Sequence, residues 1–146
     1  MIAYFDTSAL VKFYIFEEGS DIVKSIIEES ESIVTSKISY IESLSVFSRL
    51  KREGIITEKE YRKLLKSFIT DWDSYVTVEV TDRILKISGH LVELYPLRGF
   101  DALHLSSALF VQREIGEDMT FVCYDMRLWR AAAEESFKVI PERLNG

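Results

Sequence analysis

Two aspartates directly follow short apolar segments that the sequence predicts to be strands. Asp6 comes after residues 2–5, and Asp125 comes after residues 120–124. If these strands are parallel and share a sheet, both carboxylates lie at its carboxyl edge, where α/β proteins form their sites. Each aspartate alone is better explained as a helix cap, because an Asp at that position commonly accepts backbone hydrogen bonds. Their shared position is what suggests chemistry.

Two further carboxylates lie in the early turns of predicted helices. Glu42 lies among small residues on a helix that starts near Ser36, and Asp101 opens a helix after residues 98–100. Taken alone, the first is explained as an exposed glutamate and the second as an aspartate at the positive end of a helix. Together with the two strand-end aspartates, they can converge on one crevice. Four neighbouring carboxylates repel one another unless their pKa values rise or a cation neutralises them.

The donor atoms of such a crevice favour magnesium or manganese over zinc, because these ions prefer hard oxygen ligands. The chain has a single cysteine, Cys123, and two histidines, His90 and His104, so it holds no Cys/His ligand set. His104 lies three residues after Asp101, and we interpret it as a packing residue or as a hydrogen-bond partner of a metal ligand. The predicted metal ligands are Asp6, Glu42, Asp101 and Asp125.

Other catalytic motifs are missing from the sequence. No glycine-rich nucleotide loop follows a predicted strand, and no GKS or GKT sequence is present. Ser8 does not lie in a GxSxG elbow, which argues against a serine hydrolase. Cys123 follows Phe121 and Val122, which predicts a buried thiol without the electropositive surroundings that activate a nucleophile.

The elements that would position these residues alternate along the chain. Short apolar or alternating runs predict strands over residues 2–5, 32–35, 75–80, 120–124 and 137–140. Helical periodicity and capping residues predict helices over residues 7–16, 20–29, 36–53, 57–72, 81–95, 101–115 and 126–134. This order predicts one α/β domain over residues 1–146, with a mainly parallel sheet covered by helices on both faces.

Composition agrees with one globular domain and limits its surroundings. The 146 residues are 47% apolar and 29% charged, and no apolar run reaches the roughly 20 residues that span a bilayer. One cysteine and no signal-peptide pattern predict a cytoplasmic protein without a membrane partner. The net charge of −6 argues against a nucleic-acid partner on average. Local basic stretches can still meet a polyanion, although solvated helix faces are the simpler explanation; they comprise Lys51, Arg52, Lys59, Arg62, Lys63, Lys66, Arg127 and Arg130.

Four segments, taken in order, resemble a known family. They are YFDTSALVKFY around Asp6, TSKISYIESLSVF around Glu42, RGFDALHLSSAL around Asp101 and FVCYDMRLWRAA around Asp125. Together they span nearly the whole chain, which resembles the PIN-domain ribonucleases and specifically the VapC toxins of type II toxin–antitoxin pairs. The resemblance implies a PIN-like three-layer sandwich with about five strands. It also implies Mg²⁺ or Mn²⁺ at the four acidic positions, with Thr7 or Ser8 supporting them by hydrogen bonds.

The resemblance further implies a metal-dependent endoribonuclease toxin that leaves a 5′-phosphate and a 3′-hydroxyl. One or two ions would activate a water for in-line attack on a phosphodiester, and Glu42 or Asp101 would orient that water. The implied partners are RNA, a second copy of the chain and a VapB-like antitoxin whose C-terminal segment lies across the acidic crevice. Nearness to the motifs suggests RNA contacts at Lys12, Arg98, Arg127 and Arg130.

One departure from the family and three alternatives remain. Family members often carry Thr or Ser where this chain has Cys123, which puts one hydrogen bond near the metal in doubt. A catalytically silent PIN module that serves as an RNA-binding scaffold is the main alternative. A haloacid-dehalogenase-like phosphatase is weaker, because Ser8 stands where that family needs a second Asp. A receiver-like signalling domain rests only on Lys138 in the last strand.

Overall fold

A single parallel sheet of five strands forms the centre of the molecule, in a computed structural model that describes residues 1–145. The strands are β1 (Ile2–Phe5), β2 (Ser32–Ser36), β3 (Val76–Val78), β4 (Thr120–Val122) and β5 (Lys138–Ile140). Their order across the sheet is β3-β2-β1-β4-β5, and all four neighbouring pairs are parallel. The carboxyl ends of all five strands therefore share one edge, and β1 lies in the centre.

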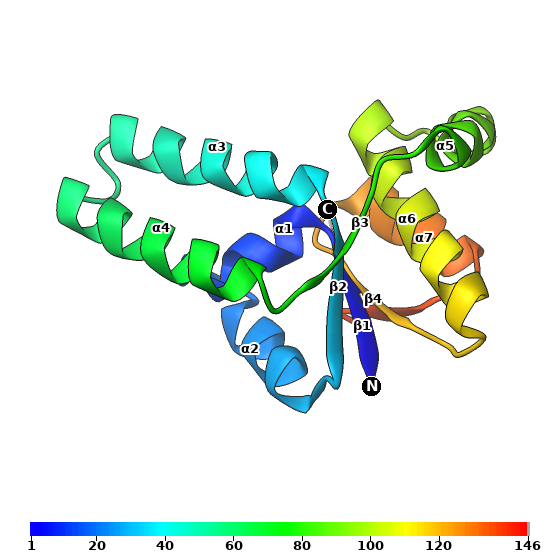
Figure 1. The fold of residues 1–146 in the computed structure, drawn as a ribbon, viewed down its shortest axis with the longest axis horizontal. Helices are drawn as coiled ribbons and strands as arrows, with labels where there is room; N and C mark the ends of the chain where they lie inside the picture. The colour runs from blue at the N-terminus through cyan, green and yellow to red at the C-terminus, as the bar shows by residue number, and fades with distance from the viewer. Residues whose placement is uncertain (146) are drawn as a thin grey trace.

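Helices cover both faces of this sheet. They are α1 (Thr7–Leu10), η1 (Val11–Phe13), α2 (Ser20–Glu29), α3 (Ile38–Arg52), α4 (Glu58–Trp72), α5 (Asp82–Leu94), α6 (Gly99–Ile115) and α7 (Met126–Glu134). Figure 1 shows α1 to α4 on one side of the strands and α5 to α7 on the other. The expected three-layer α/β sandwich is confirmed. Helices α3 and α4 extend beyond the sheet as a long antiparallel hairpin (Figure 1).

Alternating side chains of the central strands build two cores. Tyr4 and Phe121 point to the face covered by α5, α6 and α7, and their rings stack with centroids 5.3 Å apart. Ala3, Phe5 and Val122 point to the other face and pack beneath α1 to α4. The strands read as continuous apolar runs because both of their faces are buried, as a parallel sheet requires. These packed layers hold the carboxyl edge of β1 and β4 in place.

Several predicted boundaries are wrong by a few residues. The predicted strand 120–124 ends at Val122, because the Tyr124 N–H donates to the Ser8 hydroxyl at 3.0 Å instead of to a neighbouring strand. The predicted strand 75–80 shrinks to three residues, and the carbonyl of Val78 accepts from the Lys37 N–H. The predicted helix 7–16 is a single α-turn followed by a 3₁₀ turn.

Helix caps follow the sequence closely. Thr57 and Glu60 form a capping box at the start of α4, and Thr81 caps α5. Gly116, at φ 67°, ends α6 in the left-handed conformation that glycine adopts without strain. In residues 1–145 we find no helix that is both apolar enough and long enough to cross a bilayer.

Candidate active site at the carboxyl edge of the sheet

Asp6 and Asp125 lie where the sequence predicts them, at the ends of β1 and β4. Each also caps the helix that follows: Asp6 accepts from the Ala9 N–H at 3.0 Å, and Asp125 accepts from the Leu128 N–H at 3.1 Å. The capping role and the edge position therefore hold together. Asp6 is 4% exposed, so its carboxylate is buried at this edge rather than open to the crevice. The helix it caps folds back over its carboxylate.

The buried Asp6 carboxylate is satisfied by groups of the chain itself. Ser8 Oγ lies 2.7 and 2.8 Å from its two oxygens, and the Cys123 thiol lies 3.5 Å from Oδ2. Burial raises the pKa of Asp6, while the charge of nearby His104 and these hydrogen bonds lower it and offset part of the effect. The carboxylate therefore lies in a buried place that disfavours its negative charge. A bound cation would offset the cost of burying that charge.

Ser8 and Cys123 join the ends of the two central strands. Ser8 Oγ, which donates to Asp6, also accepts from the backbone N–H of Tyr124, so it ties the end of β4 to the end of β1. Cys123 provides a weak thiol contact to Asp6. Burial, followed by the nearby Asp6 charge, raises the pKa of the Cys123 thiol well above its usual value, so it remains protonated.

Glu42 is held by residues from three elements. Thr7 Oγ1 donates to Glu42 Oε1 at 2.5 Å, and His104 Nε2 lies 3.0 Å from the same oxygen. Although burial raises the pKa of Glu42, the hydrogen bond and charge of His104 and the bond from Thr7 lower it overall. Because a carboxylate only accepts, Nε2 of His104 carries the proton that faces it. Glu42 is therefore held in its ionised, fixed form.

His104 and Tyr4 form a buried support behind Glu42 that the sequence does not reveal. The Tyr4 hydroxyl lies 2.8 Å from His104 Nδ1, with Tyr4 fully buried and His104 3% exposed. Nε2 of His104 donates to Glu42, and Nδ1 forms the hydrogen bond with the Tyr4 hydroxyl. The only signal in the sequence is the spacing of His104 one helical turn after Asp101. Its predicted role as a partner of a ligand agrees with this arrangement.

Arg98 lies between Asp101 and Asp125. Its Nη2 is 3.2 Å from Asp125 Oδ2, and its Nε is 3.6 Å from Asp101 Oδ2. Burial and then the Asp125 charge raise the pKa of Asp101, and hydrogen bonding and the charge of Arg98 lower it in part. The Arg98 side chain is 73% exposed and is free to leave without disrupting the core. It is an internal counter-ion for two candidate ligands.

An open cleft of about 480 Å³ gives access to this side of the site. It is lined by Glu42, Arg98, Gly99, Phe100 and Asp101. Phe100 is 57% exposed, which makes it an aromatic side chain that faces solvent beside two of the candidate carboxylates. The sequence contains too many aromatic residues for Phe100 to be chosen by composition. Its position in the first turn of α6, next to Asp101, is what places it in the cleft.

The four carboxylates lie on one side of the molecule but do not form a ready cluster. In the described part of the chain, no three His, Cys, Asp or Glu side chains are placed to hold one metal ion. Their oxygens are engaged by Ser8, Thr7, His104 and Arg98. The donor chemistry nevertheless fits a hard divalent cation, because burial raises the pKa of both Asp6 and Asp101 and a cation would reverse that shift.

The four suggested RNA contacts have different environments. Lys12 is 12% exposed and bound to Glu17 and to the Glu18 carbonyl, so it is not available to a substrate, contrary to the suggestion from motif spacing. Arg98 reaches the acidic site itself. Arg127 and Arg130 are exposed on α7, and within residues 1–145 neither makes an ion pair.

We expect Arg98→Ala to bind Mn²⁺ about 3- to 10-fold more tightly than the wild type. Removing the guanidinium frees Asp101 and Asp125 from a positive charge that competes for the same oxygens. Because Arg98 is largely exposed, the effect remains modest. Isothermal titration with Mn²⁺ measures it, and Arg113→Ala, at an exposed position of the same helix, is the matched control. Weaker binding by Arg98→Ala would show that the pair does not compete with the cation.

Fold and site together define a parallel α/β protein with an acidic cleft at the carboxyl edge of its sheet. The PIN domain family model matches residues 3–134, and the chain belongs to that family. It is 29% identical over 144 residues to Ribonuclease VapC45 of Mycobacterium tuberculosis (strain CDC 1551 / Oshkosh), covering 99% of this chain and 98% of that protein.

Two solved structures share the fold. A toxin–antitoxin complex from Klebsiella pneumoniae matches with a TM-score of 0.67 and 15% identity, covering 98% of this chain and 99% of the other. FitAcB from Neisseria gonorrhoeae matches with a TM-score of 0.66 and 14% identity, covering 99% of this chain and 97% of the other. Both comparisons extend over the whole sandwich.

Proposed function

We propose that the protein is an endoribonuclease toxin that requires Mg²⁺ or Mn²⁺ and leaves a 5′-phosphate and a 3′-hydroxyl. The observation that carries the proposal is the placement of Asp6, Glu42, Asp101 and Asp125 around one edge of a PIN-domain sheet. The similarity to Ribonuclease VapC45 over nearly the whole chain supports RNA as the substrate.

The four carboxylates would hold the ion, which supplies a water of lowered pKa and neutralises charge on the phosphate when it is bound. The chain's own groups do the remaining work. Thr7 and His104 fix Glu42 in its ionised form, so it can orient a water and accept its proton. Arg98, once released from Asp101 and Asp125, can pair with a phosphate oxygen of the substrate.

We further propose that a VapB-like antitoxin inhibits the protein and that two copies form a dimer in the cytoplasm. A fold neighbour is described as a toxin–antitoxin complex, which supports a protein inhibitor. Arg98 in contact with Asp101 and Asp125 shows that a guanidinium fits this acidic cleft. An arginine from an antitoxin would meet the same oxygens.

The test is cleavage of total RNA by the purified protein with Mg²⁺, with Mn²⁺ and with EDTA. We expect metal-dependent cleavage by the wild type, none by Asp101→Asn, and wild-type cleavage by Asp118→Asn. Asp118 is exposed in the loop between α6 and β4 and makes no ion pair among the described residues, so it controls for the loss of one charge. A folded, metal-loaded wild type that cleaves no RNA would instead favour a silent RNA-binding scaffold.

Phe100→Ala is expected to raise the KM for single-stranded RNA about 10-fold and leave kcat within about 2-fold. Phe100 is exposed beside Glu42 and Asp101, where a base next to the scissile phosphate can stack on its ring. Base stacking on an aromatic side chain contributes about 1–3 kcal/mol. Steady-state kinetics on a labelled oligonucleotide measure both constants, with Phe100→Tyr as the conservative control. An unchanged KM in Phe100→Ala would remove the stacking role.

A further inference from the structure

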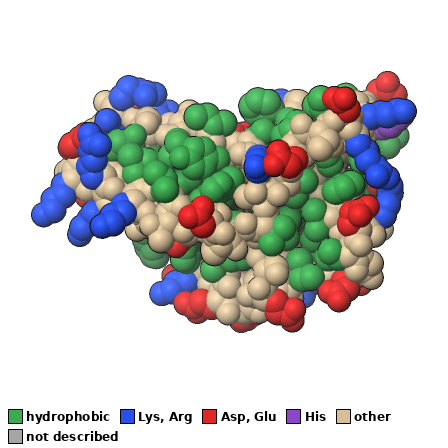
Figure 2. Space-filling view, in the orientation of Figure 1, with side chains coloured by type: hydrophobic (Ala, Val, Ile, Leu, Met, Phe, Trp, Pro, Cys, Tyr) green, Lys and Arg blue, Asp and Glu red, His purple; other side chains and the backbone are tan. Residues whose placement is uncertain are grey.

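Positive charge is concentrated in one segment of an otherwise acidic chain. Residues 49–66 contain seven Lys or Arg and three Glu, whereas the remaining residues contain 11 Lys or Arg and 21 Asp or Glu. We call this segment the basic lobe; its cations are Arg49, Lys51, Arg52, Lys59, Arg62, Lys63 and Lys66. It includes the end of α3 and most of α4, at the tip of the hairpin that projects from the sheet (Figure 1). Figure 2 shows Lys and Arg side chains gathered over this end of the molecule.

Most of this charge is available to a ligand. Glu58 pairs with Lys51 and Arg62, at 3.5 and 2.9 Å. Among the described residues, the other cations of the lobe make no ion pair and are exposed; they are Arg49, Arg52, Lys59, Lys63 and Lys66. A set of unpaired cations on one projecting element attracts a polyanion even when the protein as a whole is acidic.

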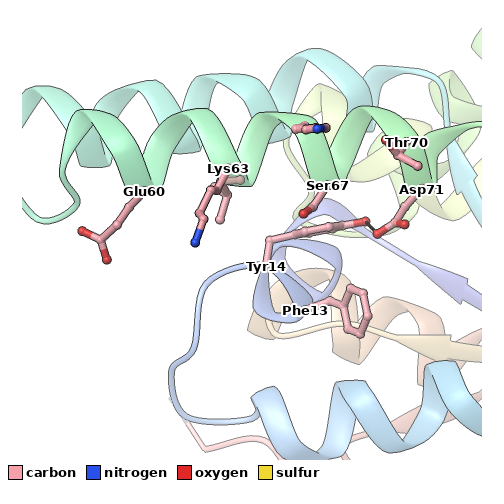
Figure 3. Close-up of a pocket in the computed structure, with 9 residues that line it drawn as sticks. Phe13, Tyr14, Glu60, Lys63, Ser67, Thr70 and Asp71 are labelled. Carbon is pink, nitrogen blue, oxygen red and sulfur yellow. Dashed lines mark hydrogen bonds between the residues drawn. The ribbon is translucent and has the colours of Figure 1, made fainter.

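A groove beside the lobe adds aromatic surface to this charge. It has a volume of about 760 Å³ and lies between η1 and α4, with Phe13 and Tyr14 on one side and Lys63 on the other (Figure 3). Lys66 also lines it. Tyr14 is held in place, because its hydroxyl donates to Asp71 at 2.9 Å. Aromatic rings beside a basic wall are the combination that holds single-stranded nucleic acid.

The two acidic residues of this groove are already engaged. Asp71 accepts a hydrogen bond from the Tyr14 hydroxyl, and Glu60 accepts one from the Thr57 N–H at 2.9 Å as part of the α4 capping box. Either carboxylate would have to break its present hydrogen bond in order to bind a cationic ligand, and that loss costs free energy. Glu60 and Asp71 keep their charges and balance Lys63 and Lys66 within the groove, so the net positive charge that favours a phosphate backbone comes from the rest of the lobe.

We propose that the basic lobe and its groove form a second RNA-binding surface, which holds the substrate strand outside the catalytic cleft. This inference rests on the proposed ribonuclease function. Helix α3 joins the two places, since Glu42 and Arg52 are ten residues apart on it, about 15 Å at 1.5 Å per residue. That distance corresponds to about four phosphates of a stacked strand at about 3.4 Å each. Longer RNA therefore reaches both surfaces, and very short RNA reaches only the cleft.

The direct test measures RNA binding without cleavage. In the Asp101→Asn background, fluorescence anisotropy of a labelled 20-nucleotide unstructured RNA compares Lys63→Gln/Lys66→Gln with the control pair Lys86→Gln/Lys138→Gln. Both control lysines are exposed and lie away from the lobe. We expect the lobe variant to bind about 10-fold more weakly and its slope of log K against log salt to fall by about 1.4, the value for two lost phosphate contacts. Equal affinity and slope in the two pairs would overturn the proposal.

Two further arms separate this inference from its rivals. A four-nucleotide RNA should bind both pairs equally, and a lobe-dependent loss with this short ligand would contradict the length argument. If the lobe variant loses an acidic protein partner while its RNA affinity is unchanged, the surface docks protein and the RNA proposal is wrong. Lobe-dependent RNA binding by a wild type that cleaves nothing with Mg²⁺ or Mn²⁺ would refute the ribonuclease proposal and leave this surface standing.

Discussion

Asp6→Asn is expected to lose at least ~100-fold of RNA cleavage while its fold becomes as stable as, or more stable than, the wild type without metal. Cleavage is lost because removing a metal ligand should cost more than removing the hydrogen-bond partner of a ligand, which lowers metal affinity or activity ~10–100-fold. Stability is kept because burial raises the pKa of Asp6, so its ionised form opposes folding at neutral pH. Asparagine keeps the cap to the Ala9 N–H without that charge. Thermal unfolding in EDTA, alongside RNA cleavage, measures both.

The pH dependence of that stability difference has a defined sign. The pKa of Asp6 in the folded protein is raised above its ordinary value of 3.8. Ionisation therefore destabilises the wild type fully above the folded pKa, and the penalty is relieved as the pH falls through that pKa towards 3.8. The difference in Tm between Asp6→Asn and wild type should shrink on acidification. A difference that grows on acidification would contradict buried Asp6 as its source.

Bound metal is expected to reverse the stability order of the wild type and Asp6→Asn, because it stabilises only the wild type. A cation bound only by the folded wild type adds about 2.7 kcal/mol to its free energy of unfolding at 100 times Kd. Mn²⁺ is therefore expected to raise the Tm of the wild type and of Asp118→Asn, and to leave Asp6→Asn nearly unchanged. An equal rise in all three would place the binding site elsewhere and refute the carboxylate assignment without any reference to RNA.

The sequence predicts the sheet and two of its edge carboxylates because their signals are local. Asp6 and Asp125 each follow a short apolar run and precede a helix, so their place at a shared edge needs only the parallel order of the strands. The burial of Asp6 depends on how α1 folds back over it, and no nearby residue indicates that. The link from Tyr4 to His104 joins residues 100 positions apart, which a single sequence cannot pair.

The bridge made by Arg98 shows a second limit of sequence reasoning. Its distance along the chain from Asp125 is 27 residues, and only the packing of α6 beside α7 brings the two together. The motif RGFDALHL marks Arg98 and Asp101 as neighbours, which explains one of the two contacts. Contacts within one helical turn are thus predictable, whereas contacts between the first turns of two helices depend on the completed fold.

His104→Ala is expected to reduce both stability and cleavage, by about 2–4 kcal/mol and at least ~10-fold. It leaves the hydroxyl of the fully buried Tyr4 without its partner and removes the donor that fixes Glu42. A buried polar group without a partner costs about 1–3 kcal/mol, and the cavity left by the ring adds to this. Chemical denaturation and steady-state cleavage measure the two losses.

Two conservative variants separate the structural and positioning roles of this histidine. Asparagine can replace Nδ1 and keep the bond to Tyr4, whereas glutamine can replace Nε2 and keep the bond to Glu42. We therefore expect His104→Asn to retain more stability and His104→Gln to retain more kcat, with KM for RNA little changed in either. Tyr4→Phe should lower the stability and leave kcat little changed. If glutamine and asparagine give the same kcat, Glu42 does not depend on His104 for its position, and the histidine serves the core only.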